Sequence, residues 1–243
     1  MAKYGLIGTN INYSFSKTFF SIKFDLEKLE NTYENFDIDN VSKFADIIKN
    51  NSNLKGLNVT IPFKEKIIPF LDKVDKEAKA IGAVNTIKFS KDGRLVGYNT
   101  DHYGFAKALA EFPPINDKTA LILGNGGASK AIKYVLDAMG FDYKIVSRTP
   151  SESTITYTDL TKEIIENHKL IINTTPLGVS PNTWECPDIP YQHITKKHFL
   201  FDLIYNPRET EFLKRGFGKG ATIANGMKML EYQAKKSWSI WRS

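Results

Sequence analysis

Cysteine is almost absent from this sequence, since Cys186 is the only one among 243 residues. A single thiol excludes an internal disulfide framework and is typical of a reducing compartment, so we expect a cytoplasmic protein. Histidine is scarce as well, and its four positions do not have the spacing of metal ligands: His102, His168, His193 and His198. We therefore expect no metal site.

Long apolar runs are missing too. No stretch reaches the roughly 18 apolar residues of a membrane-spanning helix. The opening MAKYGLIG leads into a strand pattern without the apolar core of a signal peptide. The net charge of +6 comes from scattered lysines, without the basic stripe that nucleic-acid binding requires. We expect a soluble globular protein, monomer or homodimer, whose partner is a small molecule rather than a membrane or a nucleic acid.

A glycine-rich turn between a strand pattern and a helix pattern is the most informative stretch. Thr119–Leu123 is a short apolar run typical of a buried parallel strand, and a helical pattern follows the turn GNGGAS at 124–129. Glycine permits a tight turn and the close approach of a pyrophosphate, while the N–H groups of the first helical turn face the anion. Ser129 takes the place of the usual third glycine and is small enough for close packing of helix on strand. This order predicts a dinucleotide site.

The next strand pattern, Tyr143–Val146, indicates which dinucleotide. It ends at Ser147, Arg148 and Thr149, about 20 residues beyond the glycines, where an NAD site places Asp or Glu on the ribose 2′-hydroxyl. An arginine flanked by hydroxyls suits a 2′-phosphate instead. The alternative is an arginine that is merely solvated after a strand. The sequence favours NADP.

Strand and helix patterns alternate along the whole chain. The first section predicts strands at 4–7, 33–36 and 56–61, helices at 18–29, 41–50, 64–71 and 75–81, and a hairpin of 84–90 with 95–98. After a helix at 102–111 and Pro113-Pro114, the second section predicts strands at 119–123, 143–147, 169–173 and 199–203, with helices at 127–138, 159–167 and 209–215. Such alternation implies right-handed βαβ units and a parallel sheet. An amphipathic segment at 226–241 closes the chain.

Polar residues gather in the loops of the first section, at the carboxyl ends of its strands, where α/β proteins bind ligands. They are Ser14 and Ser16, then Asn58, Thr60 and Lys64, then Asn85 and Thr86, and finally Asn99, Thr100 and Asp101. Each also has a structural explanation, because Ser and Asn favour turns and Asp101 can cap the helix that follows. Their recurrence beside a nucleotide loop favours a substrate site.

Several segments, in this order, resemble the shikimate dehydrogenase family: YGLIG with a Ser-x-Ser pair, GLNVTIPFKE, IGAVNT, GYNTD, LGNGGAS, SRT, INTTPLG, DLIYNPRET and NGMKMLEYQA. The resemblance runs from Tyr4 to Gln233. It implies reversible, NADPH-dependent reduction of 3-dehydroshikimate to shikimate in aromatic amino-acid biosynthesis. It also implies an α/β substrate domain, at 1–101 with a returning C-terminal helix at 227–243, and a Rossmann-type parallel-sheet domain at 102–226.

The resemblance also implies roles for individual residues. Lys64 and Asp101 become the catalytic acid–base pair. Substrate binding falls to Ser14 and Ser16 at the carboxylate, and to Asn58, Thr60, Asn85, Tyr205 and Gln233. Cofactor binding falls to Gly124, Asn125, Gly126, Gly127, Ala128, Ser129, Ser147, Arg148, Thr149, Asn173, Thr174, Thr175, Leu203 and Gly226, the last five near the nicotinamide half.

The chain departs from the family pattern at two loops. The serine loop reads NYSFSK, where the family usually has histidine before the first serine and proline after the second. The cofactor loop has Ser147 for the usual asparagine and lacks a second basic residue, with Glu152 nearby. Two alternatives stay open: a quinate/shikimate dehydrogenase relative with relaxed or NAD cofactor use, and a catalytically silent ligand-binding Rossmann protein.

Overall fold

The protein folds into two compact units, as seen in a computed structural model that describes residues 1–11 and 14–243. Unit 1 comprises Met1–Tyr103 and Gln233–Ser243, and unit 2 comprises Gly104–Tyr232. The chain passes between the units within two helices, α4 (Asp101–Leu109) and α8 (Met227–Arg242). The sequence predicts these boundaries at 101/102 and 226/227, slightly earlier, because no loop marks a division that falls inside a helix. Asn12 and Tyr13 of the predicted serine loop lie outside the described residues.

Unit 1 contains a mixed six-stranded sheet in the order β2-β1-β3-β5-β6-β4. Its strands are β1 (Lys3–Gly8), β2 (Thr32–Asp37), β3 (Leu54–Val59), β4 (Lys73–Val74), β5 (Thr86–Phe89) and β6 (Leu95–Tyr98). Its helices are α1 (Phe15–Leu26), α2 (Phe44–Asn50) and α3 (Lys76–Ile81), with 3-10 turns η1 (Val41–Lys43) and η2 (Ile68–Phe70). The first three strands are parallel, and β5 runs antiparallel to β3 and β6, which confirms the predicted hairpin.

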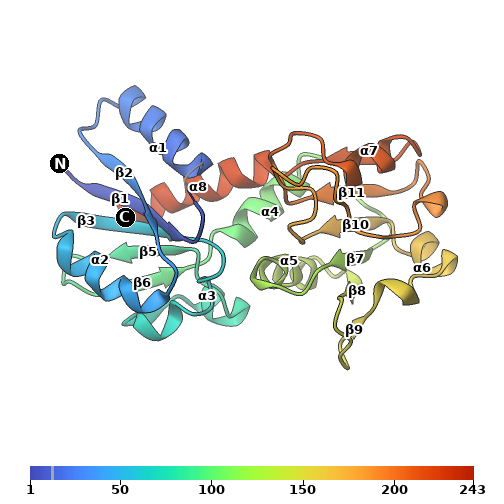
Figure 1. Ribbon diagram of the computed structural model, residues 1–243, viewed down its shortest axis with the longest axis horizontal. Helices are drawn as coiled ribbons and strands as arrows, with labels where there is room; N and C mark the ends of the chain where they lie inside the picture. Colours follow the sequence, from blue (N-terminus) through green and yellow to red (C-terminus); the bar gives the residue numbers. More distant parts are fainter. Residues whose placement is uncertain (12–13) are drawn as a thin grey trace. The chain divides into compact units, whose positions relative to one another are not determined.

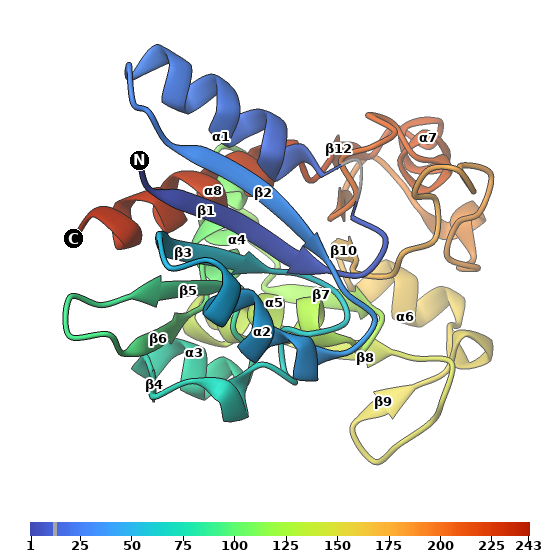
Figure 2. The same cartoon turned by 60° about the vertical axis from the view of Figure 1, so that its left-hand side comes forward.

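The two faces of this sheet are buried by different helices, as Figures 1 and 2 show. On one face, Tyr4 and Leu6 of β1 pack with α1 and with Ala234 and Trp238 of α8. On the other, Ile7 packs with residues of α2 and α3. Alternate residues of β1 thus face opposite sides, as the pleat of a strand requires. The C-terminal helix therefore completes the core of the first unit, as predicted.

Unit 2 contains a second six-stranded sheet, in the order β12-β11-β10-β7-β8-β9, and all of its pairings are parallel. Its strands are β7 (Thr119–Leu123), β8 (Asp142–Val146), β9 (Thr154–Ile155), β10 (Leu170–Asn173), β11 (Phe199–Asp202) and β12 (Thr222–Ala224). Its helices are α5 (Gly127–Ala138), α6 (Lys162–Asn167) and α7 (Glu211–Phe217), with 3-10 turns η3 (Tyr157–Asp159) and η4 (Tyr191–His193).

Helices cover both faces of the parallel sheet. Ala120 and Ile122 of β7 pack on the side of α5, whereas Leu121 and Leu123 pack on the side of α6 and α7. All four of these residues are fully buried. Burial on both faces explains why the strand is a continuous apolar run rather than an alternating one. The predicted parallel sheet is confirmed.

One predicted helix is wrong. Residues 64–71 form turns and the short η2, so Lys64 lies on a turn instead of a helix. Pro69 accounts for the difference, because proline lacks an N–H and its ring clashes with the carbonyl four residues earlier. The helix predicted at 18–29 begins three residues sooner, directly after Ser14. Within the described residues, no helix has the length and apolar character needed to cross a membrane.

We predict that Gly56→Ala destabilises unit 1. A Cβ at this position of β3 would lie 2.3 Å from Nε1 of Trp241, whose ring stacks on Tyr4 and whose Nε1 donates to the Ile87 carbonyl. Overpacking of this kind costs about 1–3 kcal/mol of unfolding free energy. Urea unfolding followed by tryptophan fluorescence measures the effect. Lys55→Ala, at an exposed position of the same strand, is the control, and equal midpoints for the two variants would contradict the prediction.

Candidate functional site

A lysine–aspartate pair lies at the centre of the polar residues of unit 1. Lys64 Nζ is 2.6 Å from Asp101 Oδ2, and the two side chains are only 16% and 10% exposed. Lys64 follows the end of β3, and Asp101 is the first residue of α4, where the helix dipole stabilises a carboxylate. Asn99 supports this helix start by accepting hydrogen bonds from the N–H groups of Asp101 and His102. The structure therefore brings together the two residues that the sequence predicts as the catalytic pair.

Asn85 fixes the second oxygen of the aspartate. Its Nδ2 donates to Asp101 Oδ1 at 2.8 Å, and its Oδ1 accepts from the backbone N–H of Thr100 at 2.7 Å. Gln233 of α8 joins this network, because its Oε1 accepts from Thr100 Oγ1 at 3.2 Å. All of these groups are buried. Asp101 is thus held from two sides, by Lys64 at one oxygen and by Asn85 at the other.

Asn58 is buried next to Asn85, and both ends of its side-chain amide form hydrogen bonds within the protein. Its Oδ1 accepts from the Tyr33 hydroxyl at 2.8 Å, and its Nδ2 donates to the Asn85 carbonyl and to Ser237 Oγ. The Tyr33 hydroxyl also bonds to Ser16. A buried chain of hydrogen bonds therefore runs from Ser16 through Tyr33 and Asn58 to the backbone of Asn85. Whether Asn58 also contacts a substrate stays a prediction.

Tyr33 is a residue that the sequence did not single out. It is 4% exposed on β2, and its ring stacks on Phe20 with centroids 4.7 Å apart. Burial raises the pKa of the Tyr33 phenol, so the hydroxyl keeps its proton and remains a donor at neutral pH. No motif marks it, because its partners lie in other elements and a tyrosine within a strand is ordinary.

The predicted carboxylate-binding serines follow β1, the strand beside β3. Ser14 is the N-cap residue of α1, and Ser16 lies in its first turn. The Ser14 Oγ is buried and has no hydrogen-bond partner among the described residues. A buried hydroxyl without a partner costs free energy, and a carboxylate at the start of a helix would supply the missing acceptor. Thr60, at the end of β3, is half-buried, with its methyl close to Gly8.

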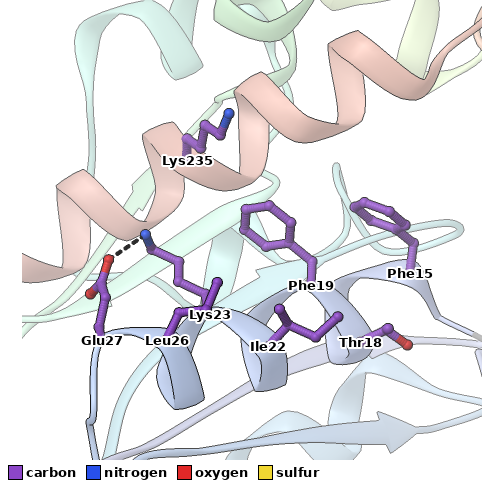
Figure 3. A pocket seen from close by; sticks show the side chains of 8 residues that line it. All are labelled: Phe15, Thr18, Phe19, Ile22, Lys23, Leu26, Glu27 and Lys235. Carbon is purple, nitrogen blue, oxygen red and sulfur yellow. Dashed lines mark hydrogen bonds and ion pairs between the residues drawn. The ribbon is translucent and has the colours of Figure 1, made fainter.

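A hollow of about 310 Å³ in unit 1 has a different character (Figure 3). Apolar side chains of α1, among them Phe15, Phe19 and Ile22, line it together with Lys235 of α8. Its charged groups include the ion pair of Lys23 with Glu27, at 2.6 Å. None of the predicted catalytic or substrate-binding residues lines it. The hollow is therefore not the candidate site.

The glycine loop of unit 2 has the shape of a phosphate cradle. Gly124 has φ +105°, and a Cβ there would lie 2.8 Å from Thr174 Oγ1. Gly126 has open space where a Cβ would stand, so a ligand can approach its backbone closely. The twelve-residue α5 begins at Gly127, and the N–H groups of its first turn lack intrahelical acceptors. The predicted pyrophosphate group fits these residues.

Two residues predicted in this site use their side chains within the protein. Ser129 is fully buried, and its Oγ donates to the Gly126 carbonyl at 2.7 Å, so it shapes the loop. Asn173 is also fully buried: its Nδ2 donates to Asp202 and its Oδ1 accepts from Thr175. A direct contact of either side chain with the cofactor stays a prediction.

The end of β8 presents the predicted phosphate-binding group. Arg148 is exposed, and within the described ranges it forms no ion pair with Glu152 or any other carboxylate. The hydroxyl of Ser147 accepts from the Thr149 N–H at 3.3 Å, which orders the turn. A guanidinium without a carboxylate partner fits a 2′-phosphate. Tyr205, Leu203 and Gly226 belong to unit 2 as well.

Comparison with known proteins assigns the chain to a family. Residues 6–87 match the family model described as the shikimate dehydrogenase substrate binding domain. A shikimate dehydrogenase (NADP(+)) from Clostridium beijerinckii is 40% identical over 252 residues, which cover 100% of this chain and 92% of the relative. The chain belongs to the shikimate dehydrogenase family. The family membership that the sequence motifs predicted is confirmed.

Solved structures agree with this assignment. Shikimate dehydrogenase from Aquifex aeolicus matches with a TM-score of 0.89 at 35% identity, covering 99% of this chain and 92% of that chain. The enzyme from Thermus thermophilus, solved in complex with NADP(H) and shikimate, matches with a TM-score of 0.86 at 29% identity, covering 99% and 93%. The predicted architecture of an α/β substrate domain and a Rossmann-type domain is the architecture of the shikimate dehydrogenase family.

We predict that Tyr33→Phe weakens substrate binding in this family member. The change removes the hydroxyl that joins Ser16 to Asn58 and leaves a buried acceptor unpaired, at a cost of about 1–3 kcal/mol of unfolding free energy. Because Ser16 loses a partner that orients it, KM for shikimate should rise more than kcat falls. Steady-state kinetics and urea unfolding measure both effects. Tyr98→Phe, in β6 of the same unit, serves as the matched control, and an unchanged KM with lowered stability would leave Tyr33 a structural role alone.

Proposed function

We propose that this protein catalyses the reversible NADP-dependent reduction of 3-dehydroshikimate to shikimate, with Lys64 and Asp101 as its acid–base pair. The observation that carries the proposal is the 2.6 Å contact of Lys64 Nζ with an aspartate whose other oxygen is held by Asn85. The motifs show only that a lysine and an aspartate are present. The structure adds that Lys64 and Asp101 lie in contact and that both side chains remain partly exposed. Full-length relatives named shikimate dehydrogenase (NADP(+)) support the reaction and the cofactor.

Unit 1 supplies the substrate groups in this proposal. The unpartnered hydroxyl of Ser14 and the hydroxyl of Ser16 bind the carboxylate at the start of α1. Thr60, Asn85 and Gln233 supply amide and hydroxyl groups for the ring hydroxyls. A contact of Tyr205 with the substrate stays a prediction.

Lys64 transfers the proton. Hydride delivery to a ring ketone leaves an alkoxide, and a donor within about 3 Å must protonate it. The Lys64 ammonium polarises the carbonyl and then donates its proton, and in the reverse direction the neutral amine accepts one. Asp101 orients Lys64 and binds a substrate hydroxyl. Because Asn85 already fixes its other oxygen, the carboxylate does not need to reorganise during the reaction.

The cofactor supplies the hydride when it is bound, and the residues of unit 2 bind and orient it. The turn from Gly124 to Ser129 and the N-terminus of α5 hold the pyrophosphate. Ser147, Arg148 and Thr149 hold the 2′-phosphate, and the segments 173–175, 203 and 226 form the nicotinamide side. The relative from Thermus thermophilus, solved with NADP(H) and shikimate, supports this pairing of ligands. A cytoplasmic location and a monomeric or homodimeric state stay predictions.

The direct test of the proposed function is an oxidation assay. Purified protein is incubated with shikimate or quinate and with NADP or NAD, and the reduced nicotinamide is followed by its absorbance. We expect the highest kcat/KM for shikimate with NADP. No turnover with any of the four combinations would overturn the enzymatic assignment, and a preference for quinate would reassign the substrate.

We predict that Lys64→Ala lowers kcat by about 10²–10⁴-fold, the usual contribution of positioned acid–base catalysis. KM for shikimate should change much less, because Ser14, Ser16 and Gln233 remain. That pattern indicates lost transition-state stabilisation rather than lost uniform binding. The measurement is steady-state oxidation of shikimate, with circular dichroism to confirm folding.

The matched control for this variant is Lys66→Ala, two residues along the same turn, where the side chain is exposed. It should keep nearly full activity. A folded Lys64→Ala protein that retained more than roughly a tenth of the wild-type kcat would remove Lys64 from the mechanism.

We predict that Arg148→Ala removes most of the preference for NADP. Loss of a charge-assisted contact with the 2′-phosphate should cost about 1.5–3 kcal/mol in NADP binding, which is roughly 10- to 150-fold in Kd, and little in NAD binding. Calorimetric titration with each cofactor measures the difference. Lys144→Ala, at an exposed position of β8, controls for the lost charge. Equal affinities of the wild type for NADP and NAD would contradict the assignment of Arg148.

A further inference from the structure

Asp202, the last residue of β11, is a fully buried carboxylate that the proposed mechanism does not use. Three donors point at it. Its Oδ1 accepts from Asn173 Nδ2 and from the Ile204 N–H, both at 3.0 Å, and its Oδ2 accepts from Thr210 Oγ1 at 2.5 Å. These donors come from the end of β10, from the turn after β11 and from the N-cap of α7. One carboxylate therefore joins three separate segments of unit 2.

The first segment continues to the glycine loop. Asn173 Oδ1 accepts from the N–H and the hydroxyl of Thr175, at 3.0 and 2.7 Å. Next to it, Thr174 Oγ1 donates to the Leu123 carbonyl at 2.8 Å, against the site where Gly124 has no side chain. The position of the 173–175 turn thus depends on an asparagine whose amide is anchored on Asp202.

The second segment continues to the start of α8. The Leu203 N–H donates to the Asn173 carbonyl, and the Ile204 carbonyl accepts from the Gly226 N–H, both at 3.0 Å. A Cβ on Gly226 would lie 2.0 Å from the Leu203 carbonyl oxygen, so the two backbones are packed without spare room. Asp202 therefore contacts or supports each of the three segments that we assign to the nicotinamide side.

The charge of Asp202 has no cationic partner within the part of the chain that the structure describes. Burial raises the pKa of this carboxyl to about 6, against the effect of its three hydrogen bonds. Tyr191 is the titratable group that interacts electrostatically with Asp202. It also lies next to Cys186, and the guanidinium of Arg215 lies over its ring. Burial raises the pKa of Tyr191 as well, so this phenol stays neutral, and Arg215 is paired with Glu211.

We infer that Asp202 is a positioning residue for the cofactor, whose ionised carboxylate holds the turns at 173–175 and 203–204 in the arrangement that the nicotinamide side requires. The inference rests on the cofactor assignment proposed above. Ionisation matters because a carboxylate accepts from all three donors at once. When the carboxyl is protonated at Oδ2, Thr210 Oγ1 has to accept from it instead of donating to it, so the Thr210 hydroxyl loses its acceptor and the bond that ties α7 to Asp202 reverses.

The test compares the wild type with Asp202→Asn, an isostere that stays neutral at every pH. Calorimetry gives the Kd of each protein for NADP. At about pH 5, below the raised pKa of this carboxyl, most of the wild-type Asp202 is protonated, and the apparent Kd rises as the competent fraction falls. We expect the ratio of the variant's Kd to that of the wild type to be about tenfold at about pH 7.5, and about twofold or less at about pH 5. The 2′-phosphate also titrates near pH 6, but it does so equally with both proteins, so the ratio removes its effect.

A purely structural role of Asp202 gives a different result. Because its pKa is raised in the folded state, the folded protein binds more protons between about pH 4 and about pH 6, and the unfolding free energy falls as the pH rises through that window. Asp202→Asn removes this slope whether or not the residue acts on the cofactor. Thermal unfolding across that range therefore detects the structural role, and a ratio of Kd values that does not change with pH would overturn the inference.

Two further measurements separate the remaining outcomes. The Kd for shikimate should be the same in both proteins, because its proposed ligands in unit 1 are unaltered. Thr210→Val removes one donor without adding or removing a charge, and we expect a weaker, severalfold rise in the Kd for NADP. This variant tests the inference even if Asp202→Asn does not fold, and an unchanged Kd would count against it. A wild type that bound shikimate but not NADP would overturn the cofactor assignment, and the positioning role with it.

Discussion

The amide of Asn85 is the group on which the candidate active site depends. It is 3% exposed, and it bonds at once to the carboxylate of Asp101 and to the backbone and side chain of Thr100. A buried amide left without partners costs about 1–3 kcal/mol per group, so its contacts restrict the loop before α4 to one arrangement. That arrangement places Asp101 Oδ2 toward Lys64. The geometry of the proposed catalytic pair is therefore a consequence of satisfying a buried side chain that takes no part in the proposed proton transfer.

The two units treat a buried carboxylate in opposite ways. Asp101 is paired with an ammonium group and keeps some exposure, so its charge is compensated. Asp202 has only neutral donors and is fully buried, and its raised pKa expresses that difference. A carboxylate with a fixed counter-ion suits a role at a reacting centre, because the ion pair fixes its orientation there. Asp202 is held only by neutral donors, so protonation can remove its charge. The positioning role that we infer for Asp202 therefore depends on pH.

The sequence predicted those features whose signals are local. The strand, glycine turn and helix at 119–138 are each marked by a local pattern: an apolar run, a cluster of glycines and a helical periodicity. The helix at 127–138 was predicted at its observed bounds. The short strands β4, β9 and β12 were missed, because two or three residues have no readable period. Lys64 and Asp101 could be named as a pair from the family's motifs, but the hydrogen bond by which Asn85 fixes Asp101 could not. Tyr33, Asp202 and Thr210 were missed for the same reason: the roles that we predict or infer for them depend on burial and on partners in other elements, which no short pattern records.

The cofactor loop departs from the family pattern because it lacks a second basic residue. Arg148 has no carboxylate partner among the described residues and Glu152 does not neutralise it, so one complete cation remains for the 2′-phosphate contact that we propose. A single exposed guanidinium, however, is screened by salt and water. The turn around it, where Ser147 accepts from the Thr149 N–H, therefore adds to the selectivity for NADP that we assign chiefly to Arg148. Because both hydroxyl residues can also donate to a phosphate, the turn supplies neutral donors in place of the missing charge. Discrimination here should therefore be less sensitive to ionic strength than that of a site with two cations.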